Sequence, residues 1–238
     1  MMSYARTPSL TRKGFSLVEL LTVLAVVGIL IAILIPVAGT ILENARRTAA
    51  SNDLRQIALA YRAYAQEGAR PRQINVDNIH QWAATLAEFS ALNTPDIYIQ
   101  GDDPLVERET RPLPRVIANP PATGGGRWSL NPEFDGFPLS VAVANGLASR
   151  ADASTTPVVW TRGLGTNGSW APLTDANPGV YGDRGGHIAF LDGHVTFYRN
   201  LTEEGGQLLH FTTRQPTSNI QEALNPGAQG LESTGRRF

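Results

Sequence analysis

The 238-residue sequence contains no cysteine, which excludes disulfides, thiolate metal sites and cysteine nucleophiles. No Ser/His/Asp pattern, phosphate-binding glycine loop or HExxH motif occurs, so we expect a protein that is not an enzyme. Basic residues are few, and Arg6, Arg12 and Lys13 all precede residue 15. Residues 15–238 therefore hold 17 basic and 21 acidic residues, a net charge of −4. An acidic body without basic clusters argues against a nucleic-acid partner.

One long apolar run is present, and it lies near the N-terminus. Residues 20–37 read LLTVLAVVGILIAILIPV, with no charge and only Thr22 polar. With residues 15–18 ahead of it, the run is long enough to span a bilayer as a helix. Because the basic residues precede it, the positive-inside rule places the N-terminus in the cytoplasm and residues 40–238 on the other side.

Two residues interrupt the apolar character of this run. Glu19 is an acid at its start, and an ionised carboxylate in hydrocarbon is costly enough to need a partner. Pro36 lacks an amide donor and its ring clashes with the preceding turn, so we expect it to kink or end the helix. A signal peptide cleaved near residues 37–39 remains an open interpretation, but an eighteen-residue core is long for one. A plain signal anchor also remains open; it would explain the span and orientation but not Glu19.

The N-terminal segment resembles the class III signal of type IV pilins and type II secretion pseudopilins. The matching features are the basic leader, the Gly14-Phe15 pair, Glu19 and Pro36. The resemblance implies that a prepilin peptidase cuts between Gly14 and Phe15 and that the new amine of Phe15 is methylated. It also implies that Glu19 pairs with the N-terminal amine of a neighbouring subunit, the partner that a buried charge needs.

The helix is expected to continue beyond the apolar run, over residues 38–67. Apolar residues recur there at three- and four-residue steps, which predicts an amphipathic helix whose stripe packs on the globular body. The main members of this stripe are Leu54, Ile57, Tyr61 and Tyr64. Gly68 and Pro71 then supply the stop signal.

The remaining residues predict one short helix followed by strands and turns. A second amphipathic pattern covers residues 78–92. Dense proline and glycine between residues 91 and 186 predict turns and short strands. The candidate strands are 115–119, 127–130, 138–144 and 156–162.

The clearest signal in this region is HIAFLDGHVTFY at residues 187–198, which predicts a hairpin with Asp192-Gly193 as a two-residue turn. That turn would pair Leu191 with His194, Phe190 with Val195, Ala189 with Thr196, Ile188 with Phe197, and His187 with Tyr198. One face would pack on the N-terminal helix through Ile188, Phe190, Val195 and Phe197. His187 and His194 would share the other face as surface residues, about 13 Å apart and too far to bind one metal ion.

This hairpin also resembles, in part, a C-terminal element of pilin-like proteins with an H-x9-DG motif. Gly185-Gly186, Asp192-Gly193 and His194-Val195 match the element. Its defining histidine would fall at position 182, where this chain has Gly182, so no role is carried over from that histidine.

Calcium is the one cofactor that the resemblance suggests, because some major pseudopilins bind it in this part of the domain. The candidate ligands are Asp175, Asp183 and Asp192, which would have to converge after folding. No interleaved DxDxDG-type loop supports them, and the turn alone explains Asp192. No other cofactor is expected.

The expected fold class is α+β, with a long N-terminal helix packed on a C-terminal antiparallel sheet. A cleaved basic leader (1–14) would precede a transmembrane half-helix (15–37) and an amphipathic half-helix (38–67). An exported loop-and-sheet domain (68–214) and a polar, mobile tail (215–238) would follow.

The resemblance implies a filament subunit in the inner membrane. The protein would be single-pass, with its N-terminus cytoplasmic and its C-terminal domain periplasmic or extracellular. The implied partners are copies of itself, other pilin-like subunits, the prepilin peptidase, an inner-membrane assembly platform and the lipid bilayer.

Several functions fit that implied location. A type II secretion pseudopilin is preferred, because the chain lacks the cysteine pair that often staples the C-terminal loop of surface pilins. A type IV pilus subunit and a membrane-anchored binding module that does not polymerise are the alternatives. A minor subunit at the filament tip is less favoured, because tip-most pseudopilins often lack the glutamate.

Overall fold

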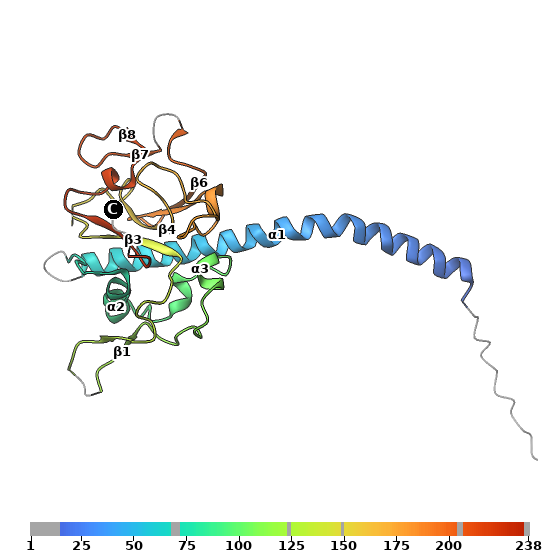
Figure 1. Cartoon of the computed structure of the whole chain (residues 1–238), viewed down its shortest axis with the longest axis horizontal. Coiled ribbons are helices and arrows are strands. Elements are labelled where there is room, and N and C mark those ends of the chain that lie inside the picture. The colour runs from blue at the N-terminus through green and yellow to red at the C-terminus, as the bar shows by residue number, and fades with distance from the viewer. Residues whose placement is uncertain (1–14, 68–71, 123–124, 149, 204–206, 236–238) are drawn as a thin grey trace, which may run out of the picture. The chain divides into compact units, whose positions relative to one another are not determined.

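The computed structural model describes residues 15–67, 72–122, 125–148, 150–203 and 207–235, without the side chains of residues 34–38 and 40. The chain divides into two compact units, Met1–Ala45 and Arg46–Phe238, and each is described by itself. Helix α1 (Leu17–Gln66) forms the described part of the first unit and continues into the second (Figure 1). The second unit therefore begins inside the helix, before residue 68, where the exported domain was predicted to start.

Within the second unit, α1 contributes the predicted apolar stripe to the core. Leu54, Ile57 and Tyr61 are at most 1% exposed, and Tyr64 is 9% exposed. The Tyr61 ring stacks on Trp82 at 5.6 Å between centroids. The three- to four-residue spacing thus identified the buried face of this part of α1 correctly. The predicted stop signal, Gly68 and Pro71, lies outside the described residues.

Helix α2 (Ile79–Ser90) confirms the second predicted helix. Its N-cap is Asn78, whose side-chain oxygen accepts a hydrogen bond from the Gln81 backbone N–H at 2.8 Å. Its apolar face buries Ile79, Trp82 and Leu86. The other described helical segments are short: η1 (Pro95–Tyr98), α3 (Pro104–Glu107), η2 (Gly182–Arg184) and η4 (Ile220–Ala223).

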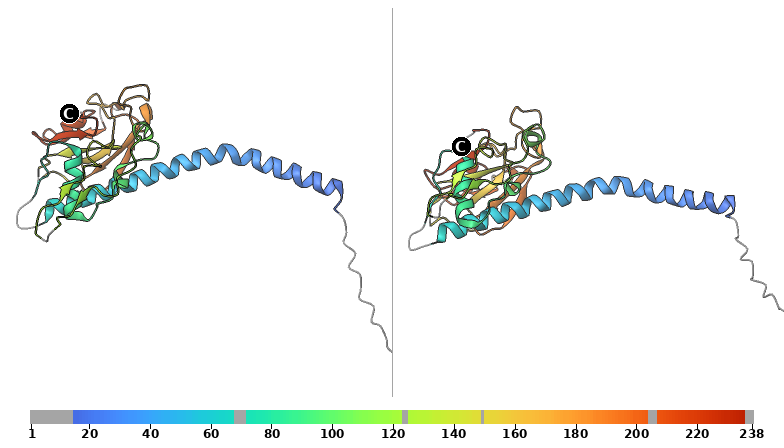
Figure 2. Two further views of the ribbon diagram at one scale, coloured as in Figure 1. Left: turned by 60° about the horizontal axis from the view of Figure 1, so that its bottom comes forward. Right: turned by 90° about the horizontal axis from the view of Figure 1, so that it is seen from below.

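The centre of the second unit is a five-stranded antiparallel sheet in the order β6-β5-β4-β3-β9. Its strands are β3 (Val141–Asn145), β4 (Pro157–Thr161), β5 (Gly186–Phe190), β6 (Val195–Tyr198) and β9 (Gln229–Glu232). The smaller ladders pair β1 (Ala118–Asn119) with β2 (Ser129–Leu130), and β7 (Leu208–Leu209) with β8 (Pro216–Thr217). Figures 1 and 2 show the last turns of α1 beside this sheet, and their buried side chains share one core. The α+β prediction is confirmed.

The β5–β6 hairpin forms where it was predicted, but its register is shifted by one residue. Ala189 pairs with Val195, Ile188 with Thr196, and His187 with Phe197. The Gly193 N–H donates to the Phe190 carbonyl at 2.8 Å, and the Phe190 N–H donates to the His194 carbonyl at 3.0 Å. The loop therefore has three residues, the last of which is Gly193 at φ +90°.

Hydrogen bonds to another segment explain why the loop is longer than the Asp192-Gly193 pair suggested. The Leu191 N–H donates to the Thr156 carbonyl at 3.0 Å, and the Asp192 N–H donates to the Ala153 carbonyl at 2.8 Å. These bonds hold both residues out of the β5–β6 ladder.

The shift also changes which side chains share a face, because successive residues of a strand point to opposite sides. His187 now lies opposite Phe197 and Ile188 opposite Thr196, so the predicted four-residue apolar face is wrong. The two histidines lie on opposite faces. His187 is buried at 5% exposure, contrary to the surface position predicted for it, whereas the His194 side chain is 44% exposed.

The C-terminal segment is part of the fold, so the prediction of a separate polar tail over 215–238 is wrong. Strand β9 pairs with β3, and Leu231 is 2% exposed. The Gly163 N–H donates to Glu232 Oε1 at 3.1 Å, which links β9 to a distant loop. The strand was missed because its sequence, QGLE, carries one apolar residue and no alternating pattern.

Candidate functional site

The first turn of α1 contains Glu19, the predicted pairing residue, and it is closed by a capping box. The Ser16 N–H donates to Glu19 Oε2 at 2.9 Å, and Ser16 Oγ accepts a hydrogen bond from the Val18 N–H at 3.3 Å. A serine at the N-cap and a glutamate three residues later satisfy backbone amides that the first turn leaves without helical partners. Glu19 therefore has a partner within its own chain. The Ser-x-x-Glu spacing is the sequence signal for this partner, and sequence reasoning missed it.

Large apolar side chains cover the described part of the first unit and are exposed all around the helix. Phe15 is 80% exposed, and Val27, the least exposed of the large apolar side chains between residues 15 and 33, is 43% exposed. A helix that is apolar all round is normally buried in protein or lipid. This segment is thus a candidate surface for subunit packing or membrane insertion.

Among the residues that the structure describes, no helix is long and apolar enough to cross a membrane. The backbone of α1 is helical through position 36, so no helix end occurs there. The side chain of Pro36 lies outside the described residues, and the predicted kink stays a prediction. Gly14 also lies outside them, whereas Phe15 is described and exposed.

The three calcium candidates do not come together. Asp192 lies in the β5–β6 loop. Its Oδ1 accepts a hydrogen bond from the His194 N–H at 3.0 Å and lies 2.6 Å from His194 Nδ1. Asp183 and Asp175 line separate clefts. The residues that the structure describes contain no group of three His, Asp or Glu side chains able to hold a metal ion.

A buried ion pair that sequence reasoning missed lies in the second unit. Arg162 Nη1 and Nη2 donate to Asp103 Oδ2 and Oδ1 at 2.8 and 2.7 Å, and both side chains are at most 1% exposed. The guanidinium also donates to the carbonyls of Leu139 and Pro178 at 3.0 Å. The pair joins the residue after β4 to the N-cap of α3, and its many hydrogen bonds suit a buried charge.

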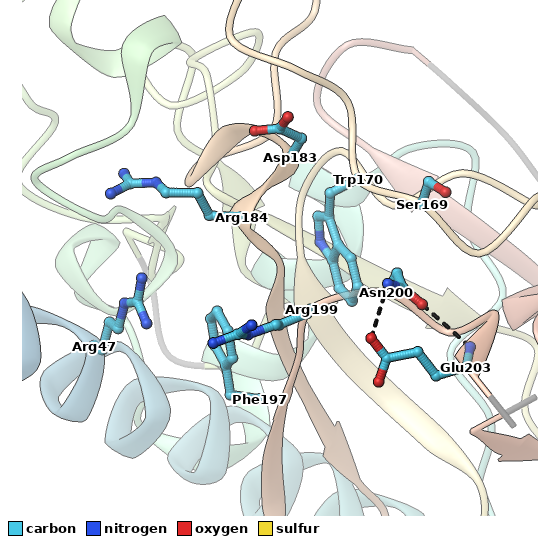
Figure 3. Close-up of a pocket in the computed structure, with 9 residues that line it drawn as sticks. All are labelled: Arg47, Ser169, Trp170, Asp183, Arg184, Phe197, Arg199, Asn200 and Glu203. Atoms are coloured by element: carbon cyan, nitrogen blue, oxygen red, sulfur yellow. Dashed lines mark hydrogen bonds between the residues drawn. The ribbon is translucent and has the colours of Figure 1, made fainter.

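The second unit also contains a cleft of about 640 Å³ that no sequence motif indicated. Figure 3 shows its lining: Arg47, Ser169, Trp170, Asp183, Arg184, Phe197, Arg199, Asn200 and Glu203. These residues come from α1, η2, β6 and the loops beside them. We call it the arginine cleft, because three of its lining residues are arginines.

Contacts with aromatic rings and loops hold the walls of the arginine cleft. Arg47 Cζ lies 4.7 Å from the Phe197 ring centroid and 5.8 Å from that of Tyr181. Trp170 is 3% exposed and packs so closely on Gly186 that a Cβ there would lie 2.4 Å from the indole Nε1. Strand β5 therefore requires glycine at position 186, which explains the second glycine of the Gly185-Gly186 pair.

His187 lies behind the Phe197 wall of the arginine cleft. Its ring packs edge-on against Phe197 at 5.0 Å and Tyr181 at 5.9 Å. Its Nδ1 is buried and has no hydrogen-bond partner among the described residues. Burial, with a smaller contribution from the Arg47 charge, lowers the pKa of His187 from 6.5 to about 4, so the ring is neutral at pH 7.

Comparison with known proteins identifies the N-terminal segment. Residues 10–35 match the family model for the prokaryotic N-terminal methylation motif. No curated protein and no solved structure matches the chain. The match includes the predicted cleavage pair, Glu19 and most of the apolar run. The chain carries a prepilin-type methylation signal on an α+β fold, which together support a pilin-like protein.

Proposed function

We propose that the chain is a filament subunit, specifically a type II secretion pseudopilin that polymerises in a periplasmic pseudopilus to drive protein export. The observation that carries this proposal is the methylation motif at residues 10–35, which coincides with a helix exposing large apolar side chains on every side. Helices of this kind bundle in an open, heterologous assembly, as a helical filament requires.

In the proposed cycle, the new subunit is held in the inner membrane by residues 15–37, with its N-terminus in the cytoplasm and residues 40–238 exported. A prepilin peptidase cuts between Gly14 and Phe15, and the Phe15 amine is methylated. Subunits then leave the lipid at an assembly platform and pack against copies of themselves and other pilin-like chains.

Glu19 has two roles in this proposal, and they are compatible. In the single chain its carboxylate caps α1 through the Ser16 N–H. A carboxylate has about four acceptor positions, so one such bond leaves room for the amine of a neighbouring subunit. The ion pair would compensate the charge when Glu19 is surrounded by apolar helices.

Three variants separate capping from pairing. Glu19→Gln keeps a side chain that suits a capping box but removes the charge. Glu19→Ala removes both, and Ser16→Ala removes the Oγ acceptor but keeps the carboxylate. Filament incorporation is measured by co-expressing each variant with the wild type and quantifying its share in sheared or cross-linked filaments.

If Glu19 pairs with the amine of a neighbouring subunit, Glu19→Gln and Glu19→Ala subunits should both be absent from filaments. Ser16→Ala subunits should be incorporated. If Glu19→Gln enters filaments as well as the wild type, the carboxylate acts only as a cap and the pairing hypothesis is wrong. Membrane insertion of every variant, measured by carbonate extraction, ensures that a missing subunit reflects failed assembly.

The kind of filament is tested by deleting the gene. Loss of a pseudopilin retains exported enzymes in the periplasm, whereas loss of a type IV pilus subunit removes surface filaments and leaves export intact. A membrane-anchored binding module that does not polymerise predicts neither defect. The absence of cysteine favours the first outcome, because surface pilins often carry a stapling disulfide.

A further inference from the structure

A small polar cavity in the second unit shares no lining residue with the arginine cleft. It lies between α1 residues from Arg46 to Asp53, the segment 99–102 and Tyr181, and its volume is about 120 Å³. We call it the Gln100 cavity. Liquid water occupies about 30 Å³ per molecule, so the cavity has room for about four water molecules or for one polar group of similar size.

The side chain of Gln100 lines this cavity without a hydrogen-bond partner. The residue is 7% exposed, and neither its Nε2 nor its Oε1 bonds to any residue that the structure describes. Its backbone is fixed, because its N–H donates to Ser140 Oγ at 2.8 Å and its carbonyl accepts from the Asp103 N–H at 3.1 Å. A buried amide without partners is destabilising, so the cavity suits a group that both donates and accepts a hydrogen bond.

Asp53 adds a negative charge to the same cavity. Among the described residues, its carboxylate has no hydrogen bond or ion pair. The other two charged residues of the lining, Arg46 and Asp102, bond to each other. Burial and the charge of Asp96 raise the pKa of Asp53, so the surroundings disfavour its ionised form. An N–H donor beside this carboxylate would stabilise it.

The donors and acceptors of the two side chains select the chemistry of a ligand. A carboxylate has no donor for Gln100 Oε1 and is repelled by Asp53, whereas an ammonium or amidinium group has no acceptor for Gln100 Nε2. A hydroxyl has one donor, which is too few for both residues. A primary carboxamide has two N–H donors and a carbonyl acceptor, so it can pair with both atoms of Gln100 and donate its second N–H to Asp53.

We propose that the Gln100 cavity binds a primary carboxamide group, held by the side chains of Gln100 and Asp53. The group comes either from a free small amide or from an asparagine or glutamine side chain of a second copy of the chain. The cavity lies in the second unit, so the proposal depends neither on N-terminal processing nor on filament formation.

Binding is measured by NMR on the full chain in detergent, with isotope-labelled glutamine and glycine. Acetamide is the probe. Acetate and acetamidinium are its controls, because they have nearly the same shape but differ in donors and acceptors. Acetamide should cause a saturable shift of the Gln100 side-chain and Gly101 backbone N–H signals, acetate should cause none, and acetamidinium should bind more weakly. If the cavity holds water only, acetamide causes no such shift and the proposal is overturned.

The variants are compared through the Gly101 signal. Gln100→Met should abolish the shift, and it should not lower the free energy of unfolding, because it replaces an unpaired buried amide by an apolar chain of similar volume. Asp53→Asn removes the charge from one hydrogen bond and should weaken binding about tenfold. Gln215→Met is the matched control, because Gln215 is exposed and lies outside the lining.

The assignment of the two side chains is overturned if Gln100→Met keeps the shift, if Asp53→Asn binds as tightly as the wild type, or if Gln215→Met loses binding. The source of the carboxamide is found by measuring self-association with and without saturating acetamide. If acetamide weakens self-association of the wild type but not of Gln100→Met, a second copy supplies the group. If acetamide binds without this difference, the ligand is a free small amide.

Discussion

The two units of the chain handle their apolar and charged groups in opposite ways. The described part of the first unit exposes its large apolar side chains, and Glu19 at its start is held by a single-turn capping box. The second unit buries its apolar side chains in one core and surrounds its buried charge, Arg162, with a carboxylate and two carbonyls. The second unit therefore buries its apolar side chains within itself, whereas the described part of the first unit leaves its apolar surface exposed.

Because of this difference, we expect stability to depend on the second unit and assembly to depend on the first. Substitutions in the second unit should change its free energy of unfolding and leave the N-terminal chemistry intact. Substitutions at the start of α1 should change processing or assembly and leave the second unit stable. The predictions below test that separation, beginning with the largest expected effect.

Asp103→Asn is expected to cause the largest loss of stability, about 3–5 kcal/mol, because it leaves the buried Arg162 guanidinium without a carboxylate. The measurement is the free energy of unfolding from urea titrations. Asp152→Asn is the control, since Asp152 and its partner Arg214 are both nearly half exposed. A surface pair of this kind contributes little, so no measurable change is expected. Equal losses in the two variants would contradict the view that the buried pair holds the second unit together.

The neutral His187 ring makes stability depend on pH. Its pKa is about 4 in the folded chain and near 6.5 when unfolded, so the unfolded chain takes up a proton first as pH falls. Stability from this group is fully present above pH 6.5 and is lost as pH falls to about 4. The loss is at most about 3.5 kcal/mol, because one pKa unit corresponds to about 1.4 kcal/mol.

The His187 contribution is isolated by comparing pH profiles of unfolding free energy. His187→Gln should flatten the decline between pH 6.5 and 4, whereas His194→Gln, at an exposed position, should keep it. Burial also lowers the pKa of His80, so some decline remains in every variant. Identical profiles for His187→Gln and the wild type would remove His187 as a source of the pH dependence.

Gly193→Ala tests the contact between the β5–β6 loop and α1. The residue has φ +90°, and an added Cβ would lie 2.6 Å from Leu59 Cδ2. Backbone strain and overpacking together are expected to cost about 2 kcal/mol. Gly136→Ala has similar strain at φ +69° but meets no atom within 4 Å, so its smaller loss measures strain alone. If adding Leu59→Ala to Gly193→Ala recovers none of the difference, the helix contact is not its cause.

The smallest effect compares the two helix caps. Asn78→Ala removes the α2 cap and should cost the second unit about 1 kcal/mol in its free energy of unfolding. Ser16→Ala removes the equivalent side-chain acceptor from α1 and should leave that free energy unchanged. A loss of stability in the second unit on Ser16→Ala would break the separation between the units.

Local spacing predicted the elements that bury one regular face. The stripe of Leu54, Ile57 and Tyr61 and the apolar face of α2 follow from helical periodicity, because the same side of a helix recurs every three to four residues. The Asp192-Gly193 pair located the hairpin correctly, but its loop is one residue longer and its register is shifted by one residue.

Features that depend on contacts distant in sequence were not predictable from local patterns. The loop register is set by bonds from Leu191 and Asp192 to the segment before β4, which no hairpin motif encodes. Asp103 and Arg162 are 59 residues apart, and neither lies in a motif. The arginine cleft has the same origin, because only the folded sheet brings its three arginines to one place.

N-terminal sequencing with intact-mass measurement of the protein recovered from cell envelopes tests most directly whether the first unit is a processed assembly segment. The account predicts a chain that begins at Phe15 and carries one additional methyl group on its amine. A chain that still begins at Met1 or Met2 would contradict it and indicate a static anchor. A chain that begins near Ala38 would also contradict it, because the exposed apolar helix would then have been removed as a signal peptide.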